Sequence, residues 1–377
     1  MSVSVTSALG TTAPEGSVIT PVNEPVYSWP HVSEQKQNKT SRHFAVLATR
    51  WLRFVCTDAS YTDASYTPSC LPGSTLSNGN SMYVEEIDLT LQSRTAEVDG
   101  VQLHYLIAGQ GPPIVLLHGY TQTSLMWRPL IPTLSEQFTV VAPDLPGIGD
   151  SSIPSDGLDM KTAAIRIHSL IRALGFEKAQ VVGHDIGLMV AYAYAAQFLS
   201  EVEKLAVMDA FLPGVDGWKP VYNNPGIWHF RFNGPTPEAL VEGRERTYFE
   251  HFWNNFAADK TRSIPEADRE KYAAAYARPG RMHAGWEYFV SFQQAAADFA
   301  VLARKKLPMP VLAIGGEKAN GDVLGQQMRL VASDVTMVVL EDTGHWVLEE
   351  RPRETTDALL SFLGKRKEGV ASGTALS

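Results

Sequence analysis

The five residues Gly-His-Asp-Ile-Gly at 183–187 constrain the fold of this chain more than any other stretch. They lie between an apolar run at 179–182 and a helix-like run at 188–197. This pattern predicts a strand that turns sharply into a helix and exposes the central side chain, Asp185, at the turn. The two glycines relieve the crowding of such a turn, because a Cβ there would clash with a neighbouring strand or helix. The alternative is an aspartate that only caps the following helix.

An aspartate at such a turn supports chemistry that a serine does not. A carboxylate that attacks a saturated carbon forms an ester, and water can hydrolyse this ester at the carboxylate's own carbon. A serine would instead form an ether, which would end catalysis after one turnover. Asp185 therefore points to displacement at an sp3 carbon, either the opening of an epoxide or the expulsion of a halide.

Two more apolar segments fit strands that precede the turn. Residues 113–117 read as a buried strand that leads into His-Gly-Tyr at 118–120, a pattern typical of a loop that carries an oxyanion hole. We expect the backbone amides of Tyr120 and Ile186 to form this hole. Residues 138–142 read as another strand, and a turn rich in Pro and Gly follows it.

A histidine near the C-terminus completes a catalytic pattern. His345 follows the apolar strand pattern at 337–340 and stands within Gly-His-Trp. A histidine on a loop after the last strand is a candidate for the general base. Nucleophile, acid and histidine is also the order of a known hydrolase triad along the chain.

Two carboxylates compete for the third position of this triad. Asp209 directly ends the apolar run at 205–208, and Glu317 follows the run at 311–316. Both stand at the carboxyl end of a predicted strand, where α/β folds keep functional groups. Such a group accepts a hydrogen bond from the histidine and stabilises the imidazolium. We favour Asp209, because it has the shorter side chain and lies at the immediate end of its strand; Glu317 is the alternative.

Taken together, these residues resemble the α/β-hydrolase superfamily, in its aspartate-nucleophile branch of epoxide hydrolases and dehalogenases. The resemblance covers about residues 83–365. It implies an α/β fold with a mostly parallel eight-stranded sheet and a helical cap inserted after strand 6. It also implies a core (82–211 and 308–365) and a cap (212–307). The N-terminal extension (1–81) is rich in Ser, Thr, Pro and Asn, a composition that predicts disorder, and we expect residues 366–377 to form a flexible tail. Met82 is an alternative start of the chain.

The donors to the leaving group separate the two activities. An epoxide oxygen needs a proton or a strong hydrogen bond, whereas dehalogenases of this branch often carry Trp or Arg where this chain has Ile186. His229 and Tyr288 stand in settings similar to the His and Tyr that open the ring in a bacterial, virulence-factor type of epoxide hydrolase. The alternative is that both are packing residues. Fluoroacetate-type dehalogenases also carry a Trp–His pair and a Tyr in the cap.

The resemblance therefore implies a hydrolase that converts epoxides to vicinal diols through a covalent aspartyl ester. Its catalytic residues would be Asp185, His345, Asp209, His229 and Tyr288, and we expect His118 and Trp127 to line the substrate pocket. A haloacid or haloalkane dehalogenase with the same triad is the main alternative. An esterase or lactonase, or a non-catalytic binding protein of the same fold, fits less well.

Composition narrows the partners. A net charge of −9 without any basic run argues against nucleic acid, and 44% apolar residues suffice for one large core. No apolar run reaches the length of a membrane span. Cys56 and Cys70 lie outside the predicted catalytic region, and the chemistry calls for no cofactor or metal. We expect a small apolar epoxide or halogenated substrate and a cytoplasmic protein, with secreted and organellar locations and a homodimer left open.

Overall fold

The computed structural model describes residues 91–364 of this 377-residue chain. Its centre is an eight-stranded sheet in the order β1-β2-β4-β3-β5-β6-β7-β8. The pairs β1–β2 and β2–β4 are antiparallel, and every other pair is parallel. The predicted α/β fold with a mostly parallel sheet is therefore confirmed. The predicted extension, the tail, Met82 and both cysteines lie outside the described residues.

The strands follow the apolar runs of the sequence. They are β1 (Gln92–Val98), β2 (Val101–Ala108), β3 (Pro113–Leu117), β4 (Thr139–Pro143), β5 (Ala179–His184), β6 (Val202–Met208), β7 (Leu307–Gly316) and β8 (Ala332–Leu340). In β4 and β5 every residue is buried. Continuous apolar strands of this kind form where helices cover both faces of a parallel sheet. Alternating inside and outside residues are absent from β4 and β5 for this reason.

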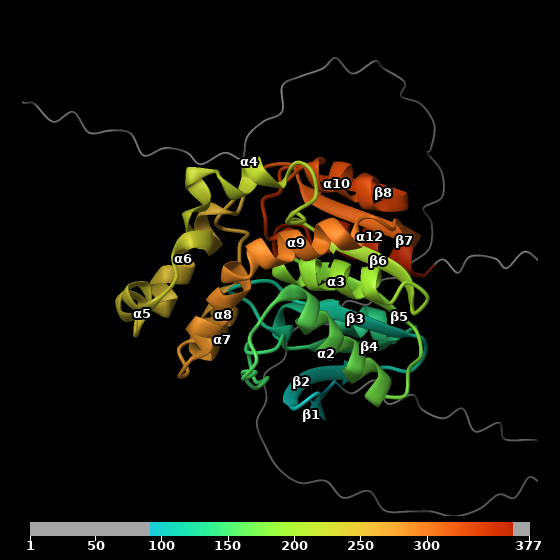
Figure 1. The fold of residues 1–377 in the computed structure, drawn as a ribbon, viewed down its shortest axis with the longest axis horizontal. Helices are drawn as coiled ribbons and strands as arrows, with labels where there is room; N and C mark the ends of the chain where they lie inside the picture. Colours follow the sequence, from blue (N-terminus) through green and yellow to red (C-terminus); the bar gives the residue numbers. More distant parts are fainter. Residues whose placement is uncertain (1–90, 365–377) are drawn as a thin grey trace, which may run out of the picture. The chain divides into compact units, whose positions relative to one another are not determined.

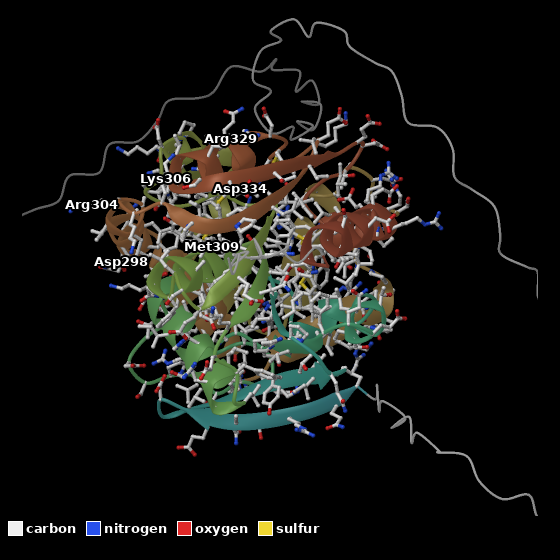
Figure 2. All side chains as sticks on the ribbon, turned by 90° about the vertical axis from the view of Figure 1, so that its right-hand side faces the viewer. Asp298, Arg304, Lys306, Met309, Arg329 and Asp334 are labelled. Carbon is white, nitrogen blue, oxygen red and sulfur yellow. The ribbon has the colours of Figure 1, made fainter. Side chains whose placement is uncertain are left out.

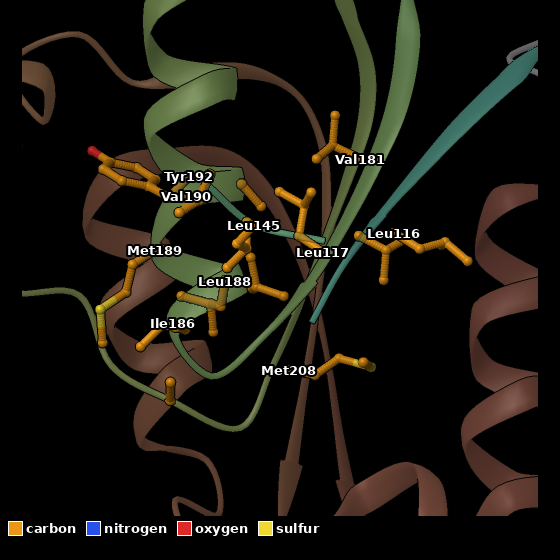
Figure 3. Close-up of a cluster of buried hydrophobic side chains, with 14 of the residues drawn as sticks. Leu116, Leu117, Leu145, Val181, Ile186, Leu188, Met189, Val190, Tyr192 and Met208 are labelled. Carbon is orange, nitrogen blue, oxygen red and sulfur yellow. The ribbon is translucent and has the colours of Figure 1, made fainter. Parts of the chain in front are cut away.

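Helices outside the cap pack against these strands or against one another. They are η1 (Ser124–Trp127), α1 (Ile131–Ser135), α2 (Met160–Ala173), α3 (Ile186–Gln197), α10 (Val323–Val331), α11 (Val347–Glu350) and α12 (Pro352–Leu363). Helix α3 packs on β5, β6 and α2, whereas α10 and α12 pack on β7 and β8. Leu188 of α3, Leu117 of β3 and Leu145 belong to one buried apolar cluster (Figure 3). This cluster fixes the start of α3 against the carboxyl end of β3.

A helical segment separates β6 from β7 in the chain, where the cap is predicted. It consists of α4 (Trp218–Tyr222), η2 (Pro225–Arg231), α5 (Pro235–Val241), α6 (Glu245–Asn255), α7 (Glu266–Tyr276), α8 (Arg281–Val290) and α9 (Phe292–Leu302). In Figure 1 the yellow and orange helices α5–α8 lie to one side of the sheet. We call this segment the cap. The exact division into core and cap stays a prediction.

Charged side chains near β7 are exposed, whereas apolar side chains of the strand itself are buried. Arg304, Lys306, Arg329 and Asp334 are exposed there, while Met309 of β7 is buried (Figure 2). Within residues 91–364, no helix combines the length and the apolar character that crossing a membrane requires.

Candidate active site

The predicted sharp turn lies between β5 and α3. Asp185 has a φ of 52° and a ψ of −124°, a conformation that non-glycine residues rarely adopt. A Cβ on Gly183 would lie 2.3 Å from the carbonyl oxygen of Gly187, and one on Gly187 would lie 2.4 Å from that of Leu117. Only glycine fits these two positions, so the chain passes through the turn and exposes Asp185. Strain of this kind costs about 1–3 kcal/mol and is typical of functional sites.

Two backbone amides hold the carboxylate of Asp185. The Tyr120 amide donates a hydrogen bond of 2.8 Å to Oδ2, and the Ile186 amide also donates to this carboxylate. Burial raises the pKa of Asp185 above its ordinary value, while His345 and the two amides oppose this effect. The amides predicted from sequence for an oxyanion hole are thus brought together beside Asp185.

His345 pairs with Asp209 next to this turn. The imidazole Nδ1 lies 2.8 Å from Oδ2 of Asp209, whose side chain is completely buried. Oδ1 accepts hydrogen bonds from the backbone amides of Gly316 (3.0 Å) and Asn320 (3.3 Å). Burial lowers the pKa of His345, but the bond to Asp209 and its charge outweigh burial and raise the pKa above the ordinary value. The pair is therefore oriented to leave Nε2 of His345 free for a proton.

Glu317, the alternative acid, lies elsewhere. Its side chain is 46% exposed and pairs with Lys318 at 3.2 Å. Its Oε2 also accepts a hydrogen bond of 3.0 Å from the backbone amide of Asp342. The structure therefore brings Asp209, and not Glu317, to the histidine.

A buried carboxylate that the sequence did not single out fixes the histidine loop. Glu350 accepts hydrogen bonds from the amides of Gly344 (3.1 Å) and Ala258 (2.8 Å). The amide of His345 itself donates to the carbonyl of Phe256 at 2.7 Å. Because Phe256 and Ala258 follow α6, these bonds tie the histidine loop to the cap. No local sequence signal marks Glu350, since its partners are backbone groups of two distant segments.

A cavity of about 40 Å³ lies over Asp185, between core and cap. Asp185, His345, Asp209 and His229 all line it. Its walls are otherwise largely apolar, formed by Phe211, Ile227, Phe230, Phe252, Phe256, Phe289 and Trp346. Within residues 91–364, no lysine or arginine lines this cavity. It therefore suits an uncharged apolar molecule.

His229 enters the cavity from η2. Its Nδ1 is buried and has no hydrogen-bond partner among the described residues. Burial, with smaller contributions from His251 and His345, lowers the pKa of His229 to about 3. At neutral pH the ring is thus uncharged and carries a single N–H.

Tyr288 does not reach the cavity, contrary to the prediction. Its side chain is completely buried, and its hydroxyl donates to the carbonyl of Pro146 at 2.9 Å. Phe289, the next residue of α8, lines the cavity instead. Successive residues of a helix point about 100° apart, so the two side chains lie on different faces of α8. Gly285 and Phe289 are about one helical turn apart, and both lie against Tyr120. This spacing is the sequence signal that could have identified the face of α8 that is turned toward the cavity.

His118 and Trp127 also lie elsewhere than predicted. Neither belongs to the lining of the cavity, and both are completely buried. Nδ1 of His118 lies 2.9 Å from the carbonyl of Gly119, and Nε2 accepts a bond of 2.9 Å from the amide of Leu145. The imidazole of His118 thus stabilises the oxyanion loop, because it satisfies backbone groups that the turn of the chain leaves without partners.

Among the described residues, His104, Asp144 and Asp150 are close enough together to share a metal ion. The first two already bond to each other at 2.8 Å, and Asp144 accepts further bonds from the amides of Ser124 and Asp150. Burial opposes ionisation of Asp144, but His104 and these bonds lower its pKa to about 2. His104 and Asp144 thus form a hydrogen-bonded pair whose polar groups already have protein partners, and this pair lies outside the cavity.

The fold and the site together define an enzyme of the hydrolase class. The chain belongs to the α/β-hydrolase fold family, whose model matches residues 112–352. The predicted membership in this superfamily is therefore confirmed.

Two curated relatives and one solved structure illustrate the similarity. The chain is 34% identical to a soluble epoxide hydrolase of Corynebacterium sp. (strain C12), over 71% of this chain and 95% of that protein. It is 25% identical to a fluoroacetate dehalogenase of Burkholderia sp., over 74% of this chain and 96% of that protein. The structure of the Cif epoxide hydrolase from Acinetobacter nosocomialis matches with a TM-score of 0.67 and 28% identity, over 72% of this chain and 89% of that one.

Proposed function

We propose that this enzyme hydrolyses an uncharged epoxide to a vicinal diol, with Asp185 as its nucleophile. The observation that carries this proposal is the composition of the cavity. A carboxylate at the strand–helix turn faces the same space as a neutral imidazole, His229, and no lysine or arginine among the described residues lines that space. The similarity to the epoxide hydrolase of Corynebacterium supports the same substrate class.

Ring opening is the first step. One oxygen of Asp185 attacks a ring carbon, the bond from that carbon to the ring oxygen breaks, and its electron pair stays on this oxygen. His229 stabilises the resulting alkoxide with a hydrogen bond from its N–H. An ester now joins Asp185 to the opened substrate. Tyr288 has no part in this step, since its hydroxyl is bonded to Pro146.

Hydrolysis of the ester is the second step. His345, held by Asp209, takes a proton from water, and the water oxygen attacks the carboxyl carbon of Asp185. The amides of Tyr120 and Ile186 stabilise the oxyanion, an interaction worth about 3–4 kcal/mol per donor in comparable enzymes. When this intermediate collapses, the diol leaves with both protons of the water, one on each of its oxygens. One water oxygen remains in the carboxylate of Asp185.

Dehalogenation of a haloacid is the second candidate, since a fluoroacetate dehalogenase is among the relatives. The cavity argues against it. The carboxylate of a haloacid needs a cationic partner in a buried site. The described part of the chain instead lines the cavity with two carboxylates, Asp185 and Asp209, and with no lysine or arginine. The epoxide proposal therefore fits the electrostatics better.

A trapped intermediate tests the proposal. The full-length His345→Gln variant is incubated with styrene oxide or with chloroacetate, and intact and peptide mass spectra are recorded. We expect the mass of one epoxide to be added on Asp185, because attack needs no base while hydrolysis does. The double variant with Asp185→Ala should gain no mass. An adduct from chloroacetate alone, or an epoxide adduct that survives Asp185→Ala, would refute the proposal.

A further inference from the structure

Phe289 occupies a central place in the cavity. Its ring centroid lies 4.6 Å from that of Tyr120, whose amide holds Asp185, and 5.4 Å from that of His229. Phe289 therefore lines the cavity next to the imidazole of His229 and borders the space into which a bound epoxide would place its ring oxygen. A hydrocarbon ring at this place offers no hydrogen bond to that oxygen.

His229 is the donor that remains. Its Nδ1 is buried without an acceptor, so the proton lies on Nε2, because an unpaired lone pair costs less than an unpaired N–H. The ring is uncharged at neutral pH, as its lowered pKa requires. It can therefore give the leaving oxygen one hydrogen bond, but it has no acidic proton to transfer.

The other polar side chains of the cavity either have partners of their own or keep their polar atoms buried. Asp209 pairs with His345, and the side-chain NH₂ of Asn320 donates a hydrogen bond of 3.4 Å to Oδ2 of Asp209. The hydroxyl of Thr121 accepts a bond of 3.0 Å from the indole of Trp253. The hydroxyl oxygen of Tyr120 and the indole nitrogen of Trp346 are buried rather than open to the cavity.

We propose that Phe289 makes this a one-donor site and thereby selects aryl-substituted epoxides, which are opened at the benzylic carbon. This inference rests on the proposed function and adds the substrate class. With one weak donor, much of the negative charge stays on the leaving oxygen. The substrate itself must then lower the barrier, and a benzylic carbon does so by conjugating its reacting orbital with the aromatic ring.

The walls of the cavity fit such a substituent. The side chains of Phe230, Phe252 and Phe256 border the same space, with His229 among them. Edge-to-face contacts between aromatic rings add about 0.5–1.5 kcal/mol per pair beyond the burial of area. A phenyl group thus gains favourable binding free energy from contact with these aromatic side chains, whereas a polar substituent would lose its hydrogen bonds to water there.

Two substrates and two variants test this inference. Styrene oxide and cyclohexyloxirane have nearly the same size, but only the first has a benzylic carbon. Phe289→Tyr adds a hydroxyl beside His229, and Tyr288→Phe removes one that points to Pro146, outside the cavity. The value of kcat/KM is measured for both substrates with the full-length protein and each variant. The position of ¹⁸O in the diol formed in H₂¹⁸O identifies the attacked carbon, because the transferred oxygen comes from Asp185 after exchange with water.

We expect the native enzyme to prefer styrene oxide by about 100-fold, the lower end of what a general acid contributes. The ¹⁸O should lie mainly on the benzylic carbon. Phe289→Tyr should raise the rate for cyclohexyloxirane and reduce this preference at least about tenfold, while Tyr288→Phe leaves it unchanged.

Comparable kcat/KM values of the native enzyme for the two substrates would refute this inference but not the proposed function. So would ¹⁸O found mainly on the terminal carbon of the diol. A folded Phe289→Tyr variant with an unchanged preference would do the same. If the native enzyme hydrolyses neither substrate and the His345→Gln variant forms no ester, the proposed function falls and this inference falls with it.

Discussion

Replacing Asp209 by Asn should stop the second half of the proposed reaction while sparing the first. The carboxylate of Asp209 accepts four hydrogen bonds, from the amides of Gly316 and Asn320, the side chain of Asn320 and Nδ1 of His345. An asparagine keeps one oxygen for the backbone amides and turns its NH₂ toward His345. The imidazole must then present a lone pair at Nδ1 and carry its proton on Nε2, where it cannot accept one from water.

The expected loss follows from this change of tautomer. The same substitution in a Ser–His–Asp triad lowers kcat about 10⁴-fold, which corresponds to about 5.5 kcal/mol. Attack by Asp185 on the epoxide needs no base, so the ester should form and persist. The structure thus predicts a burst of one equivalent of epoxide consumed, followed by very slow turnover.

The pH profile offers an independent measurement. His345 must be neutral to act as a base, so the hydrolytic step is lost as the pH falls through its pKa. Asp209 raises this pKa against the effect of burial. The Asp209→Asn variant loses this hydrogen bond and charge while burial still lowers the pKa of His345, so the acid limb of kcat should move to lower pH. Stopped-flow kinetics between about pH 4 and pH 9 would record both effects.

Glu317→Gln is the matched control, because Glu317 was the competing acid and its side chain is 46% exposed. We expect less than about a twofold change in kcat, in keeping with a surface substitution. An Asp209→Asn enzyme that keeps a tenth of its activity with an unshifted acid limb would refute the reasoning. Ester accumulation in Glu317→Gln would refute it as well.

Two predictions concern stability. Gly187→Ala should lower the free energy of unfolding by about 3 kcal/mol, as severe overpacking does, because the new Cβ would lie 2.4 Å from the carbonyl oxygen of Leu117; an unchanged thermal midpoint would contradict this. Asp144, with its pKa lowered from 3.8 to about 2, should contribute about 2 kcal/mol that is present above pH 4 and lost as the pH falls toward 2. Urea unfolding at pH 7 and pH 3 should show about half of this loss, about 1 kcal/mol, in the native protein and much less of it in Asp144→Asn; equal losses in both would contradict the assignment.

Features encoded within a few consecutive residues could be predicted from the sequence. The strand–turn–helix at Asp185 is one, because the apolar run, the two glycines and the next helix are contiguous. The strands β3, β4 and β5 are others, since burial on both faces requires apolar residues throughout. The position of His345 after the last strand follows from the same logic.

Features that depend on packing between distant segments could not be predicted. Asp209 and Glu317 have equivalent local settings, but only the first meets His345, which is 136 residues away in the chain. The partners of Glu350 are backbone amides in the histidine loop and after α6, and nothing near Glu350 announces them. These pairings depend on which distant segments come close together in the folded chain, and local sequence patterns carry no information about that.

The clearest division lies in α8. The residues of this segment predict a helix with aromatic side chains, and Asp185 at its turn predicts displacement at carbon. The packing of the folded chain is what turns Phe289 toward the cavity while Tyr288 bonds to Pro146. Neighbouring residues on a helix differ by about 100° in direction, and the rotation of the helix about its axis is set by what it packs against. The rotation of α8 therefore decides which hydrogen-bond donors the substrate meets.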